Sequence, residues 1–178
     1  MISKIKFQYY KSPVGELILA SFDDKLCLAD WRYRKMRSTI DYRLQKSLKA
    51  DFIEQPSTII HKTIQQLKEY FNKKRQLFDL DLLLIGTDFQ KSVWKELIKI
   101  PFGETKSYLQ LSKDLHNEKA IRAVASANGA NAISIIVPCH RIIGSNGKLV
   151  GYAGGLPAKK KLLALEGVYL DKQLSLFN

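Results

Sequence analysis

The residues best suited to chemistry form the run Pro138-Cys139-His140-Arg141, which directly follows an apolar stretch. A thiol beside an imidazole and a guanidinium has the surroundings that lower a cysteine pKa and produce a nucleophilic thiolate. If the chain is extended here, neighbouring side chains point to opposite faces, so His140 would reach the Cys139 thiol through a bridging water. The run therefore predicts a cysteine nucleophile with a histidine base.

The second cysteine gives a different expectation. Cys27 lies inside an apolar run without basic neighbours, which predicts a buried, inert thiol. A zinc site is not expected, because the chain has no C-x-x-C motif and only three histidines, His61, His116 and His140. We expect neither a metal nor another cofactor.

Charge indicates the partner. The chain holds 29 Lys and Arg against 17 Asp and Glu, a net charge of +12. Between Lys119 and Leu165 no acidic residue occurs, while seven basic ones do. This pattern predicts a surface that faces phosphate, as in a nucleic-acid-binding protein, although a generally basic composition would also give a high net charge. With no secretory signal and no apolar run of spanning length, we expect a cytoplasmic protein without membrane contact.

These residues need elements to position them. In the first half, apolar runs at 7–10, 17–22 and 26–31, separated by turn signals, predict a β-meander. Apolar spacing predicts helices over 39–49 and 57–72. Residues 80–85 form one more apolar run, a strand or an extended crossing segment, and a boundary follows at Gly86.

The second half has a helical pattern. Asp88 is expected to cap a helix that ends before Pro101. Short helices over 107–115 and 119–127, joined by a tight loop, suggest a helix-turn-helix, although any pair of antiparallel helices gives the same pattern. The β-branched run 133–137 predicts a strand leading to Cys139, and a last helix is expected over 159–165.

A series of short motifs runs in order through residues 86–167. These motifs include Gly86-Thr87-Asp88-Phe89-Gln90, Val93-Trp94, Ile100-Pro101-Phe102-Gly103-Glu104-Thr105, Ser107-Tyr108, Ala120-Ile121-Arg122-Ala123-Val124, Ala127-Asn128, Ile136-Val137-Pro138-Cys139-His140-Arg141, Gly151-Tyr152-Ala153-Gly154-Gly155 and Leu162-Leu163-Ala164-Leu165-Glu166-Gly167. Together they resemble the motifs of the O6-alkylguanine-DNA alkyltransferases, a family of DNA-repair proteins that each act once. The first 85 residues resemble this family only loosely.

The resemblance implies a fold and a function. The expected fold is an α/β N-terminal domain over 1–85, ribonuclease H-like with a β-meander plus helices, and then a mostly helical, winged helix-turn-helix-like domain over 86–178. The implied activity is direct reversal of O6-alkylguanine in DNA, mainly O6-methylguanine, by irreversible transfer of the alkyl group to the protein's own cysteine. Activity on O4-methylthymine is left open. The implied partner is double-stranded DNA containing O6-alkylguanine, bound by a monomer.

The resemblance also assigns catalytic roles. Cys139 corresponds to the alkyl acceptor, and His140 and Glu166 to the relay that removes the thiol proton. Asn131 corresponds to the residue that braces the turn before the active-site segment. Tyr108 matches the tyrosine whose hydroxyl bonds or protonates guanine N3.

Two further sets of residues follow from the same resemblance. For DNA binding, Arg122 would fill the gap left by a flipped nucleotide, and small residues would let the helix approach the minor groove. This set comprises Arg122, Ala123, Ala127, Tyr108, Lys119 and Arg141. The base pocket would be formed by Tyr108, Ile142, Tyr152, Ala153 and Gly154, with the Ala153 backbone N–H facing O6.

One position departs from the family pattern, and two other classes of function remain open. Ala132 stands where the family commonly has proline after the asparagine, which leaves selectivity among alkyl groups in doubt. A protein that binds or regulates at lesions without transfer would bind the same DNA and consume no alkyl group. A thiol hydrolase would turn over repeatedly and would not require DNA.

Overall fold

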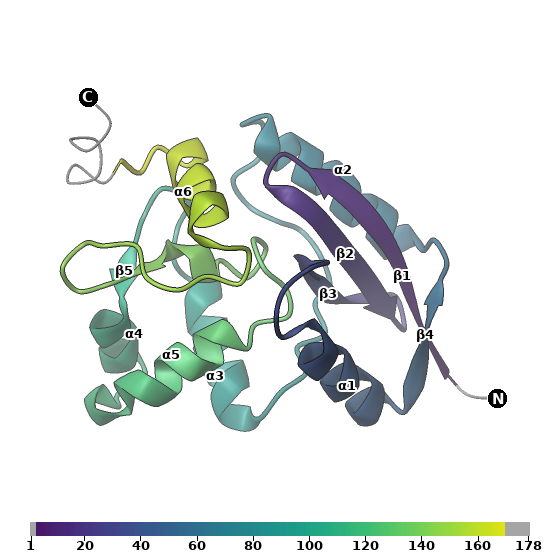
Figure 1. The fold of residues 1–178 in the computed structure, drawn as a ribbon, viewed down its shortest axis with the longest axis horizontal. Helices are drawn as coiled ribbons and strands as arrows, with labels where there is room; N and C mark the ends of the chain where they lie inside the picture. The colour runs from purple at the N-terminus through teal and green to yellow at the C-terminus, as the bar shows by residue number, and fades with distance from the viewer. Residues whose placement is uncertain (1–2, 170–178) are drawn as a thin grey trace.

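The computed structural model describes residues 3–169, which form a sheet-containing half and a helical half (Figure 1). The sheet has four strands, β1 (Ser3–Ser12), β2 (Gly15–Phe22), β3 (Lys25–Trp31) and β4 (Ala50–Glu54), in the order β3-β2-β1-β4. Strands β1, β2 and β3 pair antiparallel, which confirms the predicted meander. The strand β4, which was not predicted from the sequence, is a short, largely exposed edge strand that pairs in parallel with β1.

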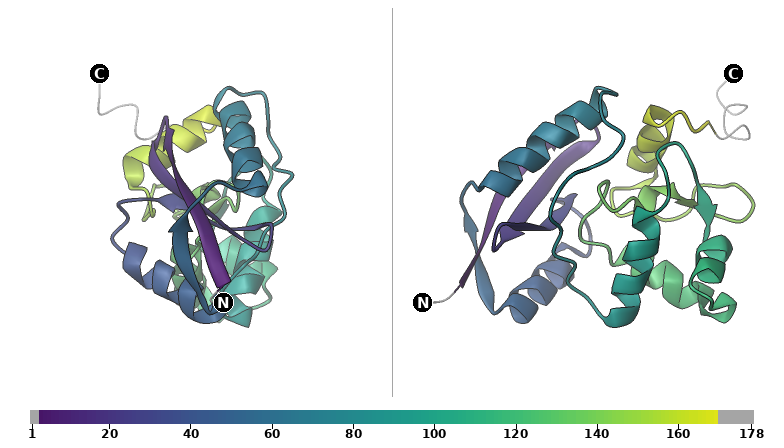
Figure 2. Two further views of the ribbon diagram at one scale, coloured as in Figure 1. Left: turned by 90° about the vertical axis from the view of Figure 1, so that its right-hand side faces the viewer. Right: turned by 180° about the vertical axis from the view of Figure 1, so that it is seen from behind.

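Two helices cover the two faces of this sheet, α1 (Arg37–Leu48) and α2 (Thr58–Phe71). Alternation along β2 explains why, because successive side chains of a strand point to opposite faces. Ile18 and Ala20 lie in the apolar cluster of α1, whereas Leu17 and Leu19 lie in the cluster of α2. The cluster of α2 continues into the helical half, so the two halves share one core. Figure 2 shows the sheet-containing half and the helical half side by side from behind.

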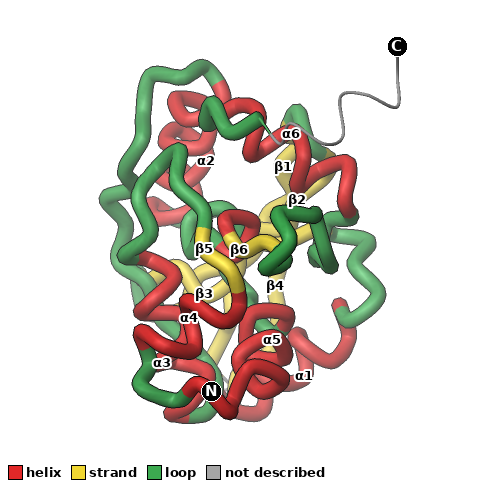
Figure 3. Tube along the Cα trace, turned by 90° about the vertical axis from the view of Figure 1, so that its left-hand side faces the viewer, coloured by secondary structure: helices red, strands yellow, loops and turns green. Residues whose placement is uncertain are grey.

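The helical half contains α3 (Asp88–Ile98), α4 (Tyr108–Asp114), α5 (Ile121–Gly129) and α6 (Leu156–Leu165). Two 3-10 turns, η1 (Glu118–Ala120) and η2 (Cys139–Arg141), and two short parallel strands, β5 (Lys106–Ser107) and β6 (Ile142–Ile143), complete it (Figure 3). The N-cap of α3 is Thr87, not Asp88 as predicted, because Thr87 and Gln90 form a capping box.

The prediction of a strand over 133–137 is wrong. The segment makes tight turns instead: the Ile136 N–H bonds to Ser134 O at 2.9 Å, the Val137 N–H bonds to Ile133 O at 2.9 Å, and Ile135 has a φ of +72°. Asn131 holds these turns, since its side chain accepts from the Ile133 N–H and donates to Val137 O, both at 2.9 Å. Ile133 forms a single β-bridge with Ala29 of β3, but no continuous strand forms, and the apolar character of the segment follows from its burial.

The free edge of β3 joins the two halves. The Ala29 N–H donates to Ala132 O at 2.9 Å, and the Ser134 N–H donates to Ala29 O at 2.7 Å. Farther along β3, Leu26 exchanges backbone bonds of 2.8 Å with the crossing segment at Asp81 and Leu83. The residues just before Cys139 are therefore anchored to the N-terminal sheet, which also covers an edge that would otherwise be exposed.

Arginines of the N-terminal half bind the end of α5. Arg34 donates to the buried Asp30 carboxylate at 2.8 Å, to Asn131 O at 3.0 Å and to Gly129 O. Arg43 donates to Ala130 O at 2.8 Å. Because the last carbonyls of a helix have no partners within it, these guanidinium groups cap α5 from the other half of the molecule.

We predict that Arg34→Met lowers the free energy of unfolding by about 3 kcal/mol or more, because it leaves the Asp30 carboxylate buried with a weakened set of donors. Urea unfolding measures the loss. Arg32→Met is the matched control: the Arg32–Glu16 pair lies at the surface, so its removal should change stability far less. Equal losses in the two variants would contradict the assignment of Arg34 as the link between the halves.

Candidate active site

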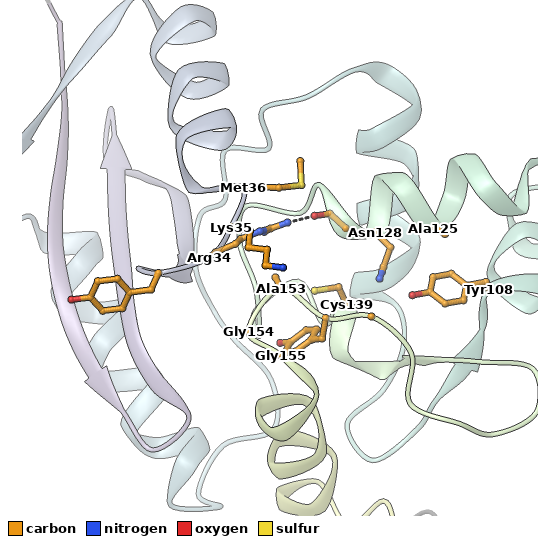
Figure 4. Close-up of a pocket in the computed structure, with 14 residues that line it drawn as sticks. Arg34, Lys35, Met36, Tyr108, Ala125, Asn128, Cys139, Ala153, Gly154 and Gly155 are labelled. Carbon is orange, nitrogen blue, oxygen red and sulfur yellow. Dashed lines mark hydrogen bonds between the residues drawn. The ribbon is translucent and has the colours of Figure 1, made fainter.

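Cys139 lines a pocket of about 660 Å³ between the two halves of the molecule. Figure 4 shows its sulfur near the middle of the pocket, with Lys35 and Met36 on one side and Tyr108 on the other. The pocket is lined by Tyr33, Arg34, Lys35, Met36, Tyr108, Ala125, Asn128, Gly129, Cys139, Gly151, Tyr152, Ala153, Gly154 and Gly155. A volume of this size suits a small organic ligand or a nucleobase.

The local fold sets the direction of the Cys139 side chain. Cys139 begins the 3-10 turn η2, in which the Arg141 N–H bonds to Pro138 O at 3.0 Å. The expected extended conformation is therefore wrong at this point. Cys139 nevertheless faces the pocket, while His140 and Arg141 are buried and reach Glu166 on the inner side.

The side chain of Glu166 is fully buried, and its carboxylate takes part in five hydrogen bonds. Its Oε1 accepts from Tyr70 Oη at 2.6 Å, from His140 Nε2 at 2.7 Å and from Arg141 Nη2 at 3.0 Å. Its Oε2 accepts from Arg141 Nε at 2.9 Å and from the Gly103 N–H at 3.2 Å. Burial alone would raise the pKa of Glu166, but the bonds and charges of His140 and Arg141 outweigh it and hold the pKa below its usual range.

These contacts fix the tautomer of His140. An ionised carboxylate only accepts hydrogen bonds, so His140 Nε2 carries the hydrogen and Nδ1 presents a lone pair. Nδ1 is buried and has no hydrogen-bond partner within residues 3–169. Burial lowers the pKa of His140, which opposes the effect of Glu166 and keeps the ring neutral at rest. The arrangement provides a base prepared to accept one proton.

The two thiols are both buried, but their settings differ. Burial raises the pKa of Cys139, against the opposing effects of Asn131, Arg34 and Lys159, so the resting group is a neutral thiol. It becomes a nucleophile only when a base removes its proton. Burial raises the pKa of Cys27 to about 12, and that thiol bonds to Ala20 O at 3.5 Å between sheet and helix.

The loop over 151–155 forms one wall of the pocket and rests on the N-terminal sheet. The rings of Trp31 and Tyr152 meet edge to face with centroids 5.1 Å apart. A Cβ atom at Gly154 would lie 2.3 Å from the Trp31 ring, so only glycine fits there. The fully buried Lys159 of α6 holds the start of this loop. Its Nζ donates to Val150 O at 2.9 Å and to Gly151 O at 3.3 Å.

The structure brings most of the expected pocket residues together. Tyr108 begins α4 and lines the pocket opposite the loop that holds Tyr152, Ala153 and Gly154. Burial raises the pKa of Tyr108, so its hydroxyl stays protonated and can donate. Ile142 does not belong to this set: it is fully buried in β6, where it pairs with Lys106 away from the pocket lining.

The expected DNA-binding residues divide into exposed and buried ones. Lys119, Arg122 and Ala123 lie exposed on η1 and the first turn of α5. Ala127 is buried on the inner face of α5, where its carbonyl accepts from Trp94 Nε1 at 2.8 Å. Arg141 is 6 % exposed and its guanidinium binds Glu166 and Ile100 O. The expectation that Ala127 and Arg141 contact DNA does not fit this arrangement.

Several residues that shape the pocket were missed from the sequence. The segment 33–36, between β3 and α1, supplies one wall, and Tyr70 of α2 reaches Glu166 across the molecule. A signal for the first was present, because four basic residues crowd into 32–37 directly after a buried strand. The sequence holds no signal for the role of Tyr70, because this residue continues the apolar stripe of α2 and is expected to be a core residue.

Two negative findings concern residues 3–169. Within them, none of the helices combines the length and the apolar character that spanning a bilayer requires. Over the same range, three or more His, Cys, Asp and Glu side chains do not gather in an arrangement that could hold a metal ion.

The fold and the pocket define a two-part protein in which a buried cysteine lines a pocket between the sheet-containing half and the helical half. Two family models match it: "6-O-methylguanine DNA methyltransferase, ribonuclease-like domain" over residues 5–84, and "6-O-methylguanine DNA methyltransferase, DNA binding domain" over residues 88–168. The chain therefore belongs to the 6-O-methylguanine DNA methyltransferase family.

Individual relatives and a solved structure support the same family assignment. A methylated-DNA–protein-cysteine methyltransferase of Methanosarcina barkeri is 44 % identical over 160 residues, covering 90 % of this chain and 96 % of the relative. One of Mycolicibacterium paratuberculosis is 39 % identical over 177 residues, covering 98 % and 99 %. The crystal structure of Mycobacterium tuberculosis OGT in complex with DNA superimposes with a TM-score of 0.78 at 38 % identity, covering 97 % of this chain and 99 % of that one.

The buried ammonium group of Lys159 makes stability depend on pH. Burial lowers the pKa of Lys159 from 10.5 to about 8, so between these values the unfolded chain binds more protons than the folded one. The stability contribution of this group therefore rises with pH across that window and is lost as pH falls through 8.

We predict that the wild type gains up to about 3 kcal/mol of unfolding free energy relative to Lys159→Met between pH 8 and 10.5. Urea unfolding at a series of pH values measures the difference. Lys161→Met, at an exposed position of α6, serves as the control. Parallel stability curves for the wild type and Lys159→Met would show that Lys159 does not titrate in this window.

Proposed function

We infer that this protein repairs O6-alkylguanine in DNA, mainly O6-methylguanine, by moving the alkyl group to the Cys139 thiol. Each molecule would act once, because the product is a thioether without a good leaving group. The observation that carries the proposal is the position of Cys139 in an open pocket, directly before a histidine whose Nδ1 is free to accept a proton. Membership of the family and the names of the relatives support the same activity.

The proposed reaction begins with a proton transfer. The Cys139 thiol gives its proton, through a bridging water, to His140 Nδ1, and Glu166 stabilises the imidazolium through Nε2. The ionic pair of thiolate and imidazolium is favoured over a free thiolate in this buried setting, since an isolated charge there would be costly. Asn131 maintains the turns that place Cys139, through its bonds to Ile133 and Val137.

The alkyl transfer itself is an in-line displacement. The Cys139 sulfur forms a bond to the alkyl carbon while the bond from that carbon to guanine O6 breaks, and its electron pair remains on the base. Tyr108, on the opposite wall of the pocket, would donate its hydroxyl hydrogen to guanine N3 and so stabilise the leaving base. Tyr152, Ala153 and Gly154 would hold the base, with the Ala153 N–H directed at O6.

The target base lies inside a duplex and must be rotated out, which costs a few kcal/mol and costs less for a base that pairs poorly. We propose that the exposed face of η1 and α5 enters the minor groove. Ala123 would allow close approach, Lys119 would contact phosphate, and Arg122 would fill the space left by the extruded base. The partner would be double-stranded DNA containing O6-alkylguanine, bound by a monomer.

We extend the proposal to the architecture. The N-terminal part, residues 1–85, would be a ribonuclease H-like domain, in line with the "ribonuclease-like" description of its family model. Residues 86–178 would form a winged helix-turn-helix-like domain, with α4 and α5 as the helix pair and the strands β5 and β6 beside them. Residues 170–178 lie outside the described part. Work on chromosomal DNA agrees with the cytoplasmic location expected from the sequence.

The first test is intact mass after incubation with a duplex oligonucleotide that contains one O6-methylguanine. We predict a gain of one methylene at Cys139, in at most one-to-one stoichiometry. Cys139→Ser should abolish the gain and keep duplex affinity within about threefold, because phosphate contacts, not the pocket, supply most of the binding. Binding without any mass gain by the wild type would favour a lesion-binding protein, and repeated turnover would favour a hydrolase.

The second test separates base extrusion from electrostatics. We predict that Arg122→Ala slows repair of duplex DNA by about tenfold or more, since extrusion costs a few kcal/mol. Its reaction with free O6-benzylguanine should be nearly unchanged, because that substrate needs no extrusion. Lys161→Ala is the control, expected to lower affinity evenly and to flatten the salt dependence by about one phosphate contact. A similar slowing of Arg122→Ala on both substrates would place Arg122 in support of the pocket instead.

A further inference from the structure

Tyr70 is a polar residue of the N-terminal half that reaches the centre of the proposed relay. It lies on α2, fully buried, with its ring packed against Phe71, Phe78 and Phe102 at centroid distances of 5.4, 5.5 and 6.1 Å. These rings leave the tyrosine little freedom to move. Its hydroxyl donates to Glu166 Oε1 at 2.6 Å, 96 residues away along the chain.

The oxygen that Tyr70 binds is the one that holds His140. Oε1 accepts from Tyr70, from His140 Nε2 and from Arg141 Nη2, whereas Oε2 accepts from Arg141 Nε and the Gly103 N–H. Each hydrogen bond to a carboxylate stabilises its negative charge, so the bond from Tyr70 lowers the attraction of Oε1 for the Nε2 hydrogen of His140. The bonds to Oε2 would keep the carboxylate in place without the tyrosine. The hydroxyl of Tyr70 therefore affects how strongly Glu166 attracts the Nε2 hydrogen more than it affects where Glu166 lies.

We propose that Tyr70 is a positioning residue of the relay: by occupying Glu166 Oε1 it limits the proton affinity of His140 and thereby the readiness of Cys139 to lose its proton. The use of this relay in DNA repair rests on the function proposed above. The link between Tyr70, His140 and Cys139 does not require DNA and can be tested without it.

The other groups around this pair define what a pH profile reports. His140 is faced by Glu166 and Arg141, by Lys159 of α6 and by the ring of Tyr152, 6.5 Å away. Cys139 is faced by Asn131, Asp30, Arg34, Lys159 and the tyrosines Tyr108 and Tyr152. Burial and the charge of Glu166 raise the pKa of Tyr70, so its hydroxyl remains a donor across the accessible range.

The experiment measures the rate at which iodoacetamide alkylates Cys139 between pH 6 and 10, in a Cys27→Ala background. The thiolate sulfur forms a bond to carbon, the carbon–iodine bond breaks, and iodide leaves, so the rate follows the thiolate population. Tyr70→Phe should raise the rate at pH 7 by about three- to tenfold, equivalent to half to one pKa unit on His140. Toward pH 10, where hydroxide removes the Cys139 proton without help from His140, the two profiles should converge.

Tyr10→Phe is the matched control, since Tyr10 is a half-buried tyrosine of β1 that is not one of the hydrogen-bond donors to Glu166, and its profile should match the parent. Thermal unfolding checks that both variants are folded. An unchanged profile for Tyr70→Phe, a lower rate at pH 7, or one common factor at every pH would overturn the proposal, because each would reduce Tyr70 to a packing or structural residue.

A double-mutant cycle with Glu166→Gln supplies the second measurement. If Tyr70 acts through the carboxylate, Tyr70→Phe should leave the profile of the Glu166→Gln protein unchanged, whereas an undiminished effect would place its action elsewhere and overturn the proposal. Should Glu166→Gln fail to fold, an NMR titration of His140 in Tyr70→Phe replaces it and must show a higher pKa. A wild type that takes no methyl group from DNA would refute the proposed repair function and leave these thiol measurements valid.

Discussion

The Glu166 carboxylate joins four parts of the chain that are far apart in sequence. Burying a carboxylate costs several kcal/mol, and one partner rarely offsets that cost completely. Here a bidentate arginine from η2, a histidine, a tyrosine from α2 and a backbone N–H at the turn before β5 share it. Because all of these donors stabilise the same buried charge, the end of α6, the cysteine turn and the N-terminal half are linked through one carboxylate.

Burial of the site also explains how the Cys139 thiol remains unreactive until a substrate enters the pocket. Burial keeps Cys139 as a neutral thiol, and its base is neutral too, so no thiolate is exposed before a substrate enters. The N-terminal half contributes to this state through three separate contacts. Arg34 caps α5, Trp31 supports the loop at Gly154, and Tyr70 binds Glu166. The N-terminal half therefore forms part of the pocket and helps to hold the residues of the active site in place.

Local patterns predicted local structure well, and the failures share one physical cause. The meander follows from apolar runs separated by turn signals, and α2 follows from apolar residues spaced three to four apart, and neighbouring residues determine both patterns. The run 133–137 misled because burial on all sides selects the same β-branched residues as a sheet does, and only the Asn131 side chain, which bonds to both ends of the run, reveals turns. Tyr70 and the wall at 33–36 depend on contacts between the halves, which periodicity does not encode.

Counts of charged residues along the sequence also do not predict which cations lie at the surface, because ion pairs form between segments that are distant in sequence. The acid-free stretch from Lys119 to Leu165 suggested a row of phosphate contacts, yet two of its seven cations face inward. Arg141 finds its counter-ion in Glu166, one residue beyond the stretch, and Lys159 is satisfied by backbone carbonyls of the pocket loop. A lack of nearby acids in the sequence thus marked two different situations: cations at the surface, such as Lys119 and Arg122, and cations that hold the site together from within. Only the fold distinguishes surface cations from buried ones, because the partner of a buried cation is set by distance in space and not by distance along the chain.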